Sequence, residues 1–301
     1  MNKLKIDTCP LCGSRQLKPV LTCTDHYASG ETFELYRCMD CGFLLTQGAP
    51  VAAEIGKYYE TPDYISHSDT RKGLMNRVYH WVRQFMLLRK AQLVERTSGR
   101  TSGSLLDIGT GTGYFPHTMQ QRGWQVQAIE KSAQARAFAR NHFGLDVKAD
   151  EAFQQLPADG FDVITLWHVM EHLEPLNETW IQLRKLLKAR GVLVLAVPNP
   201  ASYDAQKYGE RWAAYDVPRH LWHFTPEVMR QWGAKHGFRL LETHPMPLDA
   251  FYVSMLTERY QGCRWSFVKG AWTGLLAWLH TWNHPERSSS MIYVFSPNEG
   301  E

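Results

Sequence analysis

The sequence predicts an α/β fold in which helices flank a largely parallel sheet, with a small β module placed before it. A strand-like run at residues 105–108 passes directly into a glycine-rich turn and a helix, which is typical of a parallel sheet that binds a ligand at its carboxyl edge. Strand-like and helical patterns then alternate up to residue 244, as in doubly wound sheets. Two Cys-x-x-Cys pairs within the first 41 residues predict the separate module.

The charge of the chain is nearly balanced. The 301 residues include 33 Lys and Arg against 30 Asp and Glu, a formal net charge of +3. This balance provides no global attraction to nucleic acid or to an anionic membrane. The N-terminus has no apolar run typical of secretory signals, and no stretch of about 18 apolar residues predicts a spanning helix. We therefore expect a cytoplasmic protein without a transmembrane segment, whose cysteines are reduced.

Four of the six cysteines form two knuckles, Cys9 with Cys12 and Cys38 with Cys41, and a glycine follows each knuckle. Glycine permits the positive φ that such a turn needs, so each knuckle directs two thiolates at one point. Four thiolates in a tetrahedron suit a closed structural Zn²⁺ site, which leaves no position for water or substrate. Residues 1–50 are thus predicted to be a zinc ribbon.

The predicted ribbon lacks the charge of a nucleic-acid-binding module. Residues 1–50 contain five basic and five acidic residues, so no positive surface is expected. A β-hairpin over residues 16–22 and 32–36 would fill the gap between the knuckles. Cys23 and Cys263 have no partner in this scheme and are expected to be small buried residues.

Residues 51–99 are predicted to link the ribbon to the α/β core. Residues 51–70 carry three tyrosines without a regular pattern, whereas apolar residues recur at helical spacing over residues 76–95. Basic residues cluster in this part of the chain: Arg71, Lys72, Arg77, Arg83, Arg89, Lys90 and Arg96. A solvated helix face is the favoured interpretation, and contact with an anionic ligand is the alternative.

The glycine-rich turn of the core carries the strongest functional pattern. Asp107 opens it, and Gly109, Gly111 and Gly113 follow at a spacing that lets a ligand approach the backbone. A second predicted strand ends in Glu130, a position suited to accept the hydroxyls of a ribose. An acidic residue at the opening is unfavourable for a pyrophosphate and favourable for a cationic sulfonium ligand with a free ammonium group.

This part of the chain resembles the class I S-adenosylmethionine-dependent methyltransferases. The resemblance rests on the segment from Leu105 to Gly113, on Glu130, on the residues from Asp150 and on residues 161–173. It implies a Rossmann-like, seven-stranded methyltransferase sheet with S-adenosylmethionine as cofactor. The cofactor residues that it implies are Asp107, Gly109, Thr110, Gly111 and Gly113 at the amino-acid end, Glu130 and Lys131 near the ribose, Asp150 and Glu151 near the adenine, and Trp167 and His168 beneath the methionine.

The segment after the predicted fifth strand is expected to meet the acceptor, because loops at the carboxyl ends of parallel strands carry the site in such folds. Residues 217–225 resemble a motif of the zinc-containing sugar C-methyltransferases, which also join two Cys-x-x-Cys pairs to a class I domain. That resemblance places the family's base at His220, although Val217 and Arg219 replace its tyrosine and glutamate. The catalytic candidates are His220, His172 and His223, with His168 as a further histidine; a hydrogen-bonded structural role is the alternative for each.

A helical cap is predicted near the C-terminus. Residues 251–289 would form this insertion before a final strand at residues 290–295. Its apolar residues recur at helical spacing and are rich in tryptophan: Trp265, Val268, Trp272, Leu275, Leu276 and Leu279, with Trp278 and Trp282 beside them. A lid over the acceptor pocket or an oligomer contact is the favoured interpretation, and peripheral membrane contact through residues 265–282 is the alternative.

Together these patterns predict S-adenosylmethionine-dependent methyl transfer to a small-molecule acceptor, sugar-like or otherwise polar, at oxygen or carbon. The ribbon and linker would precede a methyltransferase core over residues 100–301. Two alternatives stay open: an RNA methyltransferase that binds RNA through the ribbon, and a methyltransferase that acts on a lipid-linked acceptor. The balanced charge of the ribbon argues against the first.

Overall fold

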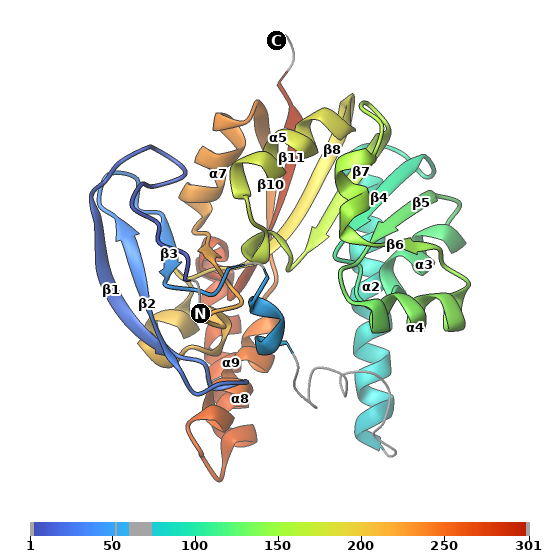
Figure 1. Ribbon diagram of the computed structural model, residues 1–301. Helices are drawn as coiled ribbons and strands as arrows, with labels where there is room; N and C mark the ends of the chain where they lie inside the picture. Colours follow the sequence, from blue (N-terminus) through green and yellow to red (C-terminus); the bar gives the residue numbers. More distant parts are fainter. Residues whose placement is uncertain (1–2, 52, 60–73, 299–301) are drawn as a thin grey trace.

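A computed structural model describes residues 3–51, 53–59 and 74–298 of the chain, with side chains from residue 80 onward in the last of these ranges. Residues 60–73, which belong to the predicted linker, lie outside the described residues. Figure 1 shows a small N-terminal sheet on one side of the molecule and a larger sheet with its helices on the other.

The larger sheet has seven strands in the order β10–β11–β8–β7–β4–β5–β6. They are β4 (Ser104–Ile108), β5 (Gln125–Ile129), β6 (Val147–Lys148), β7 (Phe161–Trp167), β8 (Leu187–Pro198), β10 (Phe238–Pro245) and β11 (Ser290–Pro297). Neighbouring strands from β8 to β6 are parallel, and β11 runs antiparallel to both β8 and β10. The predicted Rossmann-like seven-stranded sheet is confirmed, and β6, with two residues, is its shortest strand.

Helices cover both faces of this sheet because alternate residues of its central strands point to opposite sides. On β4, Leu105 packs in a cluster with α2 (Leu74–Ser98) and α3 (Tyr114–Gln121). The next residue, Leu106, packs instead with α5 (Leu176–Leu186) and α7 (Pro226–Lys235). Burial on both faces explains why the strands β4, β7 and β8 appear in the sequence as continuous apolar runs.

The N-terminal module forms a four-stranded sheet in the order β1–β2–β3–β9. The strands β1 (Leu17–Thr24) and β2 (Thr32–Cys38) form the predicted hairpin, and β3 (Leu44–Gln47) pairs with β2. The fourth strand, β9 (Trp222–His223), comes from the segment predicted to meet the acceptor. This strand was not expected, because two residues carry no alternating pattern and their pairing partner lies far away in the chain.

The two sheets share one apolar core. The ring of Phe43, beside β3, lies 5.9 Å from that of Trp222 and 5.6 Å from that of Trp232 on α7. Asn177 on α5 adds a hydrogen bond from its Nδ2 to the carbonyl of Pro10 at 3.2 Å. The N-terminal part of the chain therefore packs directly against the large sheet and its helices.

The predicted cap consists of two antiparallel helices, α8 (Asp249–Tyr260) and α9 (Ser266–Asn283). They pack through small residues: a Cβ added at Gly270 would lie 2.4 Å from the Cα of Met255, and one at Gly274 would lie 2.6 Å from the Cα of Phe251. The tryptophan-rich stripe therefore remains on the outside, with Trp265, Phe267, Val268, Trp272, Leu279 and Trp282 exposed. Across the part of the chain that the structure describes, no helix combines the length and hydrophobicity needed to span a bilayer.

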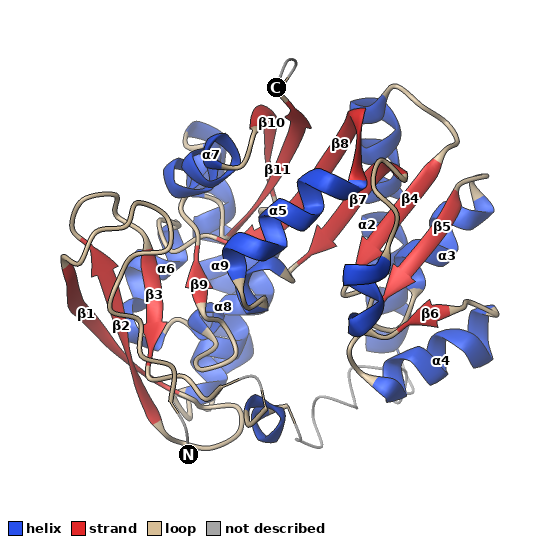
Figure 2. Cartoon of the chain, turned by 45° about the horizontal axis from the view of Figure 1, so that its top comes forward, coloured by secondary structure: helices blue, strands red, loops and turns tan. Residues whose placement is uncertain are grey.

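Shorter helical segments complete the fold. They are α4 (Ala133–Phe143), α6 (Tyr203–Tyr208), and the 3-10 turns η1 (Ile55–Tyr58), η2 (Asp150–Gln155), η3 (Met170–His172), η4 (Gly209–Arg211), η5 (Ala213–Tyr215) and η6 (Pro285–Arg287). The turn η2 begins two residues after β6, which is why that strand ends early. The parallel strands end on the side of the large sheet that faces β9 and α8, and this edge carries the candidate site (Figure 2).

Candidate active site

The turn between β4 and α3 leaves its backbone open to a ligand. Gly109, Gly111 and Gly113 have positive φ angles of 67°, 56° and 86°. A Cβ at Gly109 would lie 2.4 Å from Cγ2 of Val169, and one at Gly113 would lie 2.8 Å from Cδ1 of Leu145. A Cβ at Gly111 would meet nothing within 4 Å. Two of the glycines thus permit close packing, and the third faces open space, as a ligand-binding turn requires.

Asp107, at the end of β4, is held by two hydroxyl groups. Thr110 Oγ1 donates to one carboxylate oxygen at 2.6 Å, and Thr165 Oγ1 donates to the other at 2.5 Å. The residue is only 1% exposed, and burial raises the pKa of its carboxyl to about 6 in spite of these hydrogen bonds. A buried carboxylate in this state is stabilised by any cationic group that approaches it.

Glu130 follows the neighbouring strand β5 and is oriented by the backbone. Its Oε2 accepts the N–H of Gly111 and its Oε1 accepts the N–H of Ser132, both at 2.8 Å. The structure therefore brings the Glu130 carboxylate onto the open glycine of the turn, nineteen positions away in the sequence. Three further residues of the predicted cofactor site lie at exposed positions of the same edge: Lys131 after β5, and Asp150 and Glu151 at the start of η2.

The loop after β7 carries Trp167 and His168. His168 forms ion pairs at 3.3 Å with Asp249 of α8 and at 3.7 Å with Glu171. Burial disfavours the charge of His168, but these two carboxylates outweigh it and raise the pKa to about 9. The imidazole therefore favours its protonated form at neutral pH. Lys90 of α2 places its Nζ 4.3 Å from the centre of the Trp167 ring.

Neither partner of this loop was assigned to the site from the sequence. Lys90 was noted only as a member of a basic cluster, and Asp249 stands just before the predicted cap. Lys90 lies within a helix that the sequence predicts, so the sequence indicates its secondary structure but not the direction of its side chain. Asp249 is 81 positions beyond His168 in the chain, and no local pattern links two such residues.

Glu171, His172 and His220 form a buried cluster at this edge. The rings of His172 and His220 lie 4.5 Å apart, and His220 Nε2 is 3.9 Å from Glu171 Oε1. Burial and the neighbouring His172 lower the pKa of His220 to about 4. Burial raises the pKa of Glu171, but the surrounding histidines outweigh it and the net shift is downward. The cluster at neutral pH thus pairs a carboxylate with an unprotonated His220.

His223 is also a catalytic candidate, but its ring is engaged by the N-terminal sheet. The hydroxyl of Thr46 donates to the carbonyl of His220 at 2.6 Å and therefore accepts from His223 Nε2 at 3.0 Å. Burial lowers the pKa of His223 to about 3. The structure brings His220 and His172 together and leaves His223 on β9, outside their cluster.

Arg219, which departs from the resembling family's motif, is the anchor of the His220 loop. Its guanidinium lies 3.1 Å from the carboxylate of Asp25 and 2.7 Å from that of Asp216, and it donates to the carbonyl of Tyr58 at 2.9 Å. Burial disfavours its charge, but the two carboxylates outweigh it and raise the pKa of Arg219. The loop is therefore tied to the β1–β2 hairpin and to η1 by one buried cation.

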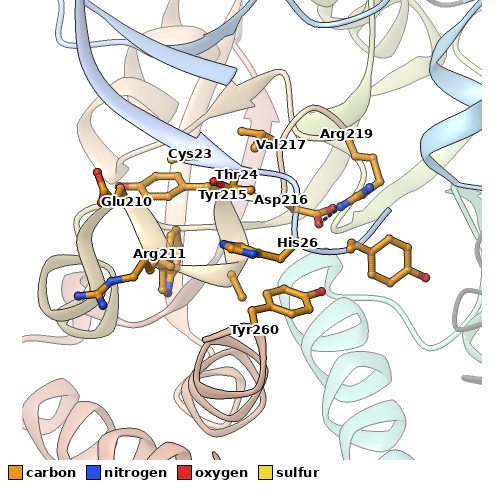
Figure 3. A pocket seen from close by; sticks show the side chains of 13 residues that line it. Cys23, Thr24, His26, Glu210, Arg211, Tyr215, Asp216, Val217, Arg219 and Tyr260 are labelled. Carbon is orange, nitrogen blue, oxygen red and sulfur yellow. Dashed lines mark hydrogen bonds and ion pairs between the residues drawn. The ribbon is translucent and has the colours of Figure 1, made fainter. Parts of the chain in front are cut away.

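A separate pocket lies on the outer side of this ion pair (Figure 3). Its lining includes Cys23 and Tyr215, and the stacked rings of His26 and Tyr260 lie 5.5 Å apart within it. The residues of the histidine cluster are not part of its lining. Cys23 is buried as expected, whereas Cys263 is half-buried.

The four knuckle cysteines converge at one end of the N-terminal sheet. Cys9 Sγ lies 3.6 Å from Cys41 Sγ, Cys12 Sγ lies 3.5 Å from Cys38 Sγ, and all four sulfurs lie within 4.8 Å of one another. Four thiolates around a zinc ion, with bonds of about 2.3 Å, are roughly 3.8 Å apart. The glycines that follow the knuckles adopt φ angles of 78° and 77°, as the predicted turns require. This arrangement is compatible with a zinc ribbon.

Comparison with known proteins identifies relatives among methyltransferases. The chain is 33% identical over 101 residues to the mitochondrial ubiquinone biosynthesis O-methyltransferase of Schizosaccharomyces pombe, and 27% identical over 150 residues to the ubiquinone biosynthesis O-methyltransferase of Rhodopseudomonas palustris. These alignments span 31% and 46% of this chain, and 36% and 58% of the relatives, less than two thirds of either one.

Among solved structures, the chain aligns with an S-adenosylmethionine-dependent methyltransferase from Archaeoglobus fulgidus. The identity is 19% and the TM-score is 0.48, over 71% of this chain and 93% of that chain. A family model described as a methyltransferase domain matches residues 80–243, which is more than half of the chain. The matched range begins within α2 and ends within β10, so it includes the glycine turn, Glu130 and the loop after β7. The chain therefore belongs to the methyltransferase-domain family.

Proposed function

We propose that the protein transfers the methyl group of S-adenosylmethionine to a hydroxyl oxygen of a small polar molecule. The observation that carries the proposal is the position of the Glu171, His172 and His220 cluster. It adjoins the loop after β7, and that loop packs against the glycine turn through Val169. A methyl donor on the turn and a proton acceptor in the cluster would then lie on the same edge of the sheet.

The residues of the turn fit a ligand with a cationic amino-acid end. Gly111 leaves open space, the buried carboxyl of Asp107 lies beside it, and Glu130 presents a carboxylate at the next strand tip. Asp107 would face the ammonium group, and Glu130 would accept from the ribose hydroxyls. When bound, S-adenosylmethionine supplies a methyl group on a sulfonium centre, which an oxygen nucleophile attacks in line.

His220 is the proposed proton acceptor. Its Nδ1 donates to the carbonyl of Ala214 at 2.9 Å, so its Nε2 carries the lone pair and points toward Glu171. The carboxylate of Glu171 would stabilise the imidazolium that forms when the acceptor hydroxyl loses its proton. Because burial keeps His220 unprotonated, the proton acceptor is ready at neutral pH.

The choice of oxygen over carbon rests on the relatives, whose names describe O-methyltransferases. A second candidate is an acceptor with an apolar chain. The exposed stripe of Trp265, Trp272 and Trp282 on α9 favours it, since such a surface can hold an apolar tail or lie against a lipid interface. A small polar acceptor and a lipid-linked acceptor would use the same histidine cluster.

We also infer that Cys9, Cys12, Cys38 and Cys41 bind one structural Zn²⁺. The sulfur spacing supports this, and a set of four thiolates leaves no open position for substrate. The ion would stabilise the small N-terminal sheet, whose three strands from residues 1–50 have little core of their own.

The proposal is tested by titration with S-adenosylhomocysteine, followed by methyl transfer from a labelled donor to phenolic, sugar and polyprenyl-phenol acceptors. We expect His220→Ala to bind S-adenosylhomocysteine as the wild type does and to lose turnover at least about a hundredfold. His142→Ala, at an exposed position on α4, is the matched control and should retain turnover. Full turnover by His220→Ala, or no binding of S-adenosylhomocysteine by the wild type, would refute the proposal.

A further inference from the structure

The cluster of Glu171, His172 and His220 contains acceptor atoms without a donor between them. Glu171 is 1% exposed, and among the described residues neither of its carboxylate oxygens has a hydrogen-bond partner. Burying an ionised carboxylate without hydrogen bonds lowers the stability of the fold by several kcal/mol, on the order of the penalty for an isolated buried charge, unless a cation compensates it. Its nearest cation is protonated His168, whose Nδ1 lies 3.7 Å from Glu171 Oε1, so the carboxylate has an ion-pair partner but no hydrogen bond.

The tautomers of both histidines follow from their Nδ1 contacts. His220 Nδ1 lies 2.9 Å from the carbonyl oxygen of Ala214. His172 Nδ1 lies 2.9 Å from the carbonyl oxygen of Arg219 and 3.1 Å from the hydroxyl of Tyr59, which can accept from it. A carbonyl oxygen only accepts, so each Nδ1 carries the proton and each Nε2 has a free lone pair. The lone pair of His220 Nε2 lies 3.9 Å from Glu171, and the His172 ring lies edge-to-face against the His220 ring, 4.5 Å away.

The distances in the cluster are too long for direct hydrogen bonds and suit a shared ion. His220 Nε2 lies 3.9 Å from Glu171 Oε1, and one ligand atom from each of the three residues lies within 4.8 Å of the others. Hydrogen bonds between such groups span about 2.7–3.2 Å. Ligands held about 2.0–2.2 Å from one cation are separated by roughly 3–4 Å. We propose that Glu171, His172 and His220 bind one divalent first-row transition-metal ion.

The charged groups around the cluster leave this position to a cation. Protonated His168 lies 3.7 Å from Glu171, beyond hydrogen-bond distance, and its other nitrogen is paired with Asp249. Asp216 lies 3.8 Å from His220 Nε2 and adds a further negative charge, although Arg219 pairs with it. Two Nδ1–H groups held by backbone carbonyls are also what orients metal-binding imidazoles in known sites.

The donor set decides the class of ion. Two imidazoles and one carboxylate form a facial set that leaves coordination positions open, and such sets favour first-row divalent ions over Mg²⁺ or Ca²⁺. We place the acceptor at these open positions. An ion there would bind the acceptor oxygen and lower the pKa of its hydroxyl group. When the ion is bound, His220 is one of its ligands, and the ion rather than His220 activates the acceptor hydroxyl. This role of the ion in methyl transfer rests on the proposed function.

The binding of the ion is tested without turnover. Full-length protein with its four-cysteine site loaded with Zn²⁺ is dialysed against Co²⁺, and the bound cobalt is counted by mass spectrometry and by visible absorption. We expect one cobalt per chain in the wild type, with bands of nitrogen and oxygen coordination. Glu171→Gln and His172→Gln should each weaken cobalt binding at least about tenfold. Glu178→Gln and His142→Gln, at exposed positions, are matched controls and should bind as the wild type does.

Retention of S-adenosylhomocysteine binding shows that each variant is folded. Wild-type protein that binds no cobalt, or Glu171→Gln that binds it as tightly as the wild type, would overturn the metal site. If cobalt binding fails while His220→Ala still loses turnover, the proton-acceptor role of His220 stands without the ion. If cobalt binds but no acceptor is methylated, the metal site stands and the proposed function fails.

Discussion

The difference between two neighbouring glycines of the turn yields a quantitative prediction. Gly109 and Gly111 both have positive φ angles, 67° and 56°. A Cβ at Gly109 would lie 2.4 and 2.9 Å from the two γ-carbons of Val169, whereas a Cβ at Gly111 meets nothing within 4 Å. Substitution by alanine therefore imposes the same kind of backbone strain at both positions, but a steric overlap at only one.

The magnitudes follow from these two effects. A left-handed alanine costs about 1–2 kcal/mol, which both variants bear. Forcing an extra carbon into a packed site costs about 1–3 kcal/mol more, which only Gly109→Ala bears. We expect the free energy of unfolding to fall by about 2–5 kcal/mol in Gly109→Ala and by about 1–2 kcal/mol in Gly111→Ala. Gly111→Ala should weaken the binding of S-adenosylhomocysteine more than Gly109→Ala does, because the new Cβ at residue 111 enters the open space of the turn.

Urea unfolding of both variants in a Val169→Ala background separates the two effects. Removing the γ-carbons of Val169 leaves its Cβ 3.3 Å from the new Cβ at Gly109, a contact that a small shift can relieve. Val169→Ala should therefore recover about 1–3 kcal/mol of the loss in Gly109→Ala and nothing of the loss in Gly111→Ala. Equal costs of Gly109→Ala in the two backgrounds would show that the packing argument is wrong.

Three further predictions concern the charges and the cysteines. Arg219→Met leaves two carboxylates without their buried cation and should lower the free energy of unfolding by about 3–5 kcal/mol. The exposed control Arg230→Met should change the free energy of unfolding by less than about 1 kcal/mol. Equal effects of the two substitutions in urea unfolding would contradict the structural role of the Arg219 ion pairs. The pKa of His168 is raised from 6.5 to about 9, so its stabilising effect is complete below pH 6.5 and is lost as pH rises to about 9. The stability difference between wild type and His168→Gln should shrink over that pH window, and a constant difference would exclude the raised pKa. Cys38→Ser should reduce the zinc content, measured by mass spectrometry after dialysis, from one per chain to much less; unchanged zinc would exclude the four-cysteine site.

Local sequence patterns were sufficient for the elements of the large sheet. The strand before the glycine turn, the turn itself and the strand that ends at Glu130 depend on neighbours within a few tens of residues, so apolar runs and glycine spacing predict them directly. The convergence of the four cysteines was equally predictable, because each knuckle is a local turn and four thiolates need one ion. The resemblance then supplied the order of strands that local patterns alone leave open.

The contacts that complete the site could not be predicted in this way. Asp249 and His168, and Arg219 and Asp25, are pairs joined only by the folded chain, and each consists of ordinary charged residues without a surrounding motif. The helix α9 shows the same limit. Hydrophobic periodicity predicts its tryptophan stripe, but it does not predict that α9 packs on α8 through Gly270 and Gly274, where close backbone approach needs small side chains.

The position of His220 depends on the N-terminal sheet. Three independent links fix its loop to the N-terminal sheet: the pairing of β9 with β3, the hydrogen bond from Thr46 to the carbonyl of His220, and the ion pair of Arg219 with Asp25. Ordering each loop residue costs about 1–2 kcal/mol in conformational entropy, so a loop of this length needs such links to hold one geometry. The N-terminal sheet can form these links only if its own strands are held in place. Because its core is small, the four cysteines would stabilise the strands by binding an ion. A structural ion at one end of the sheet would in this way determine the position of a proton acceptor at the other.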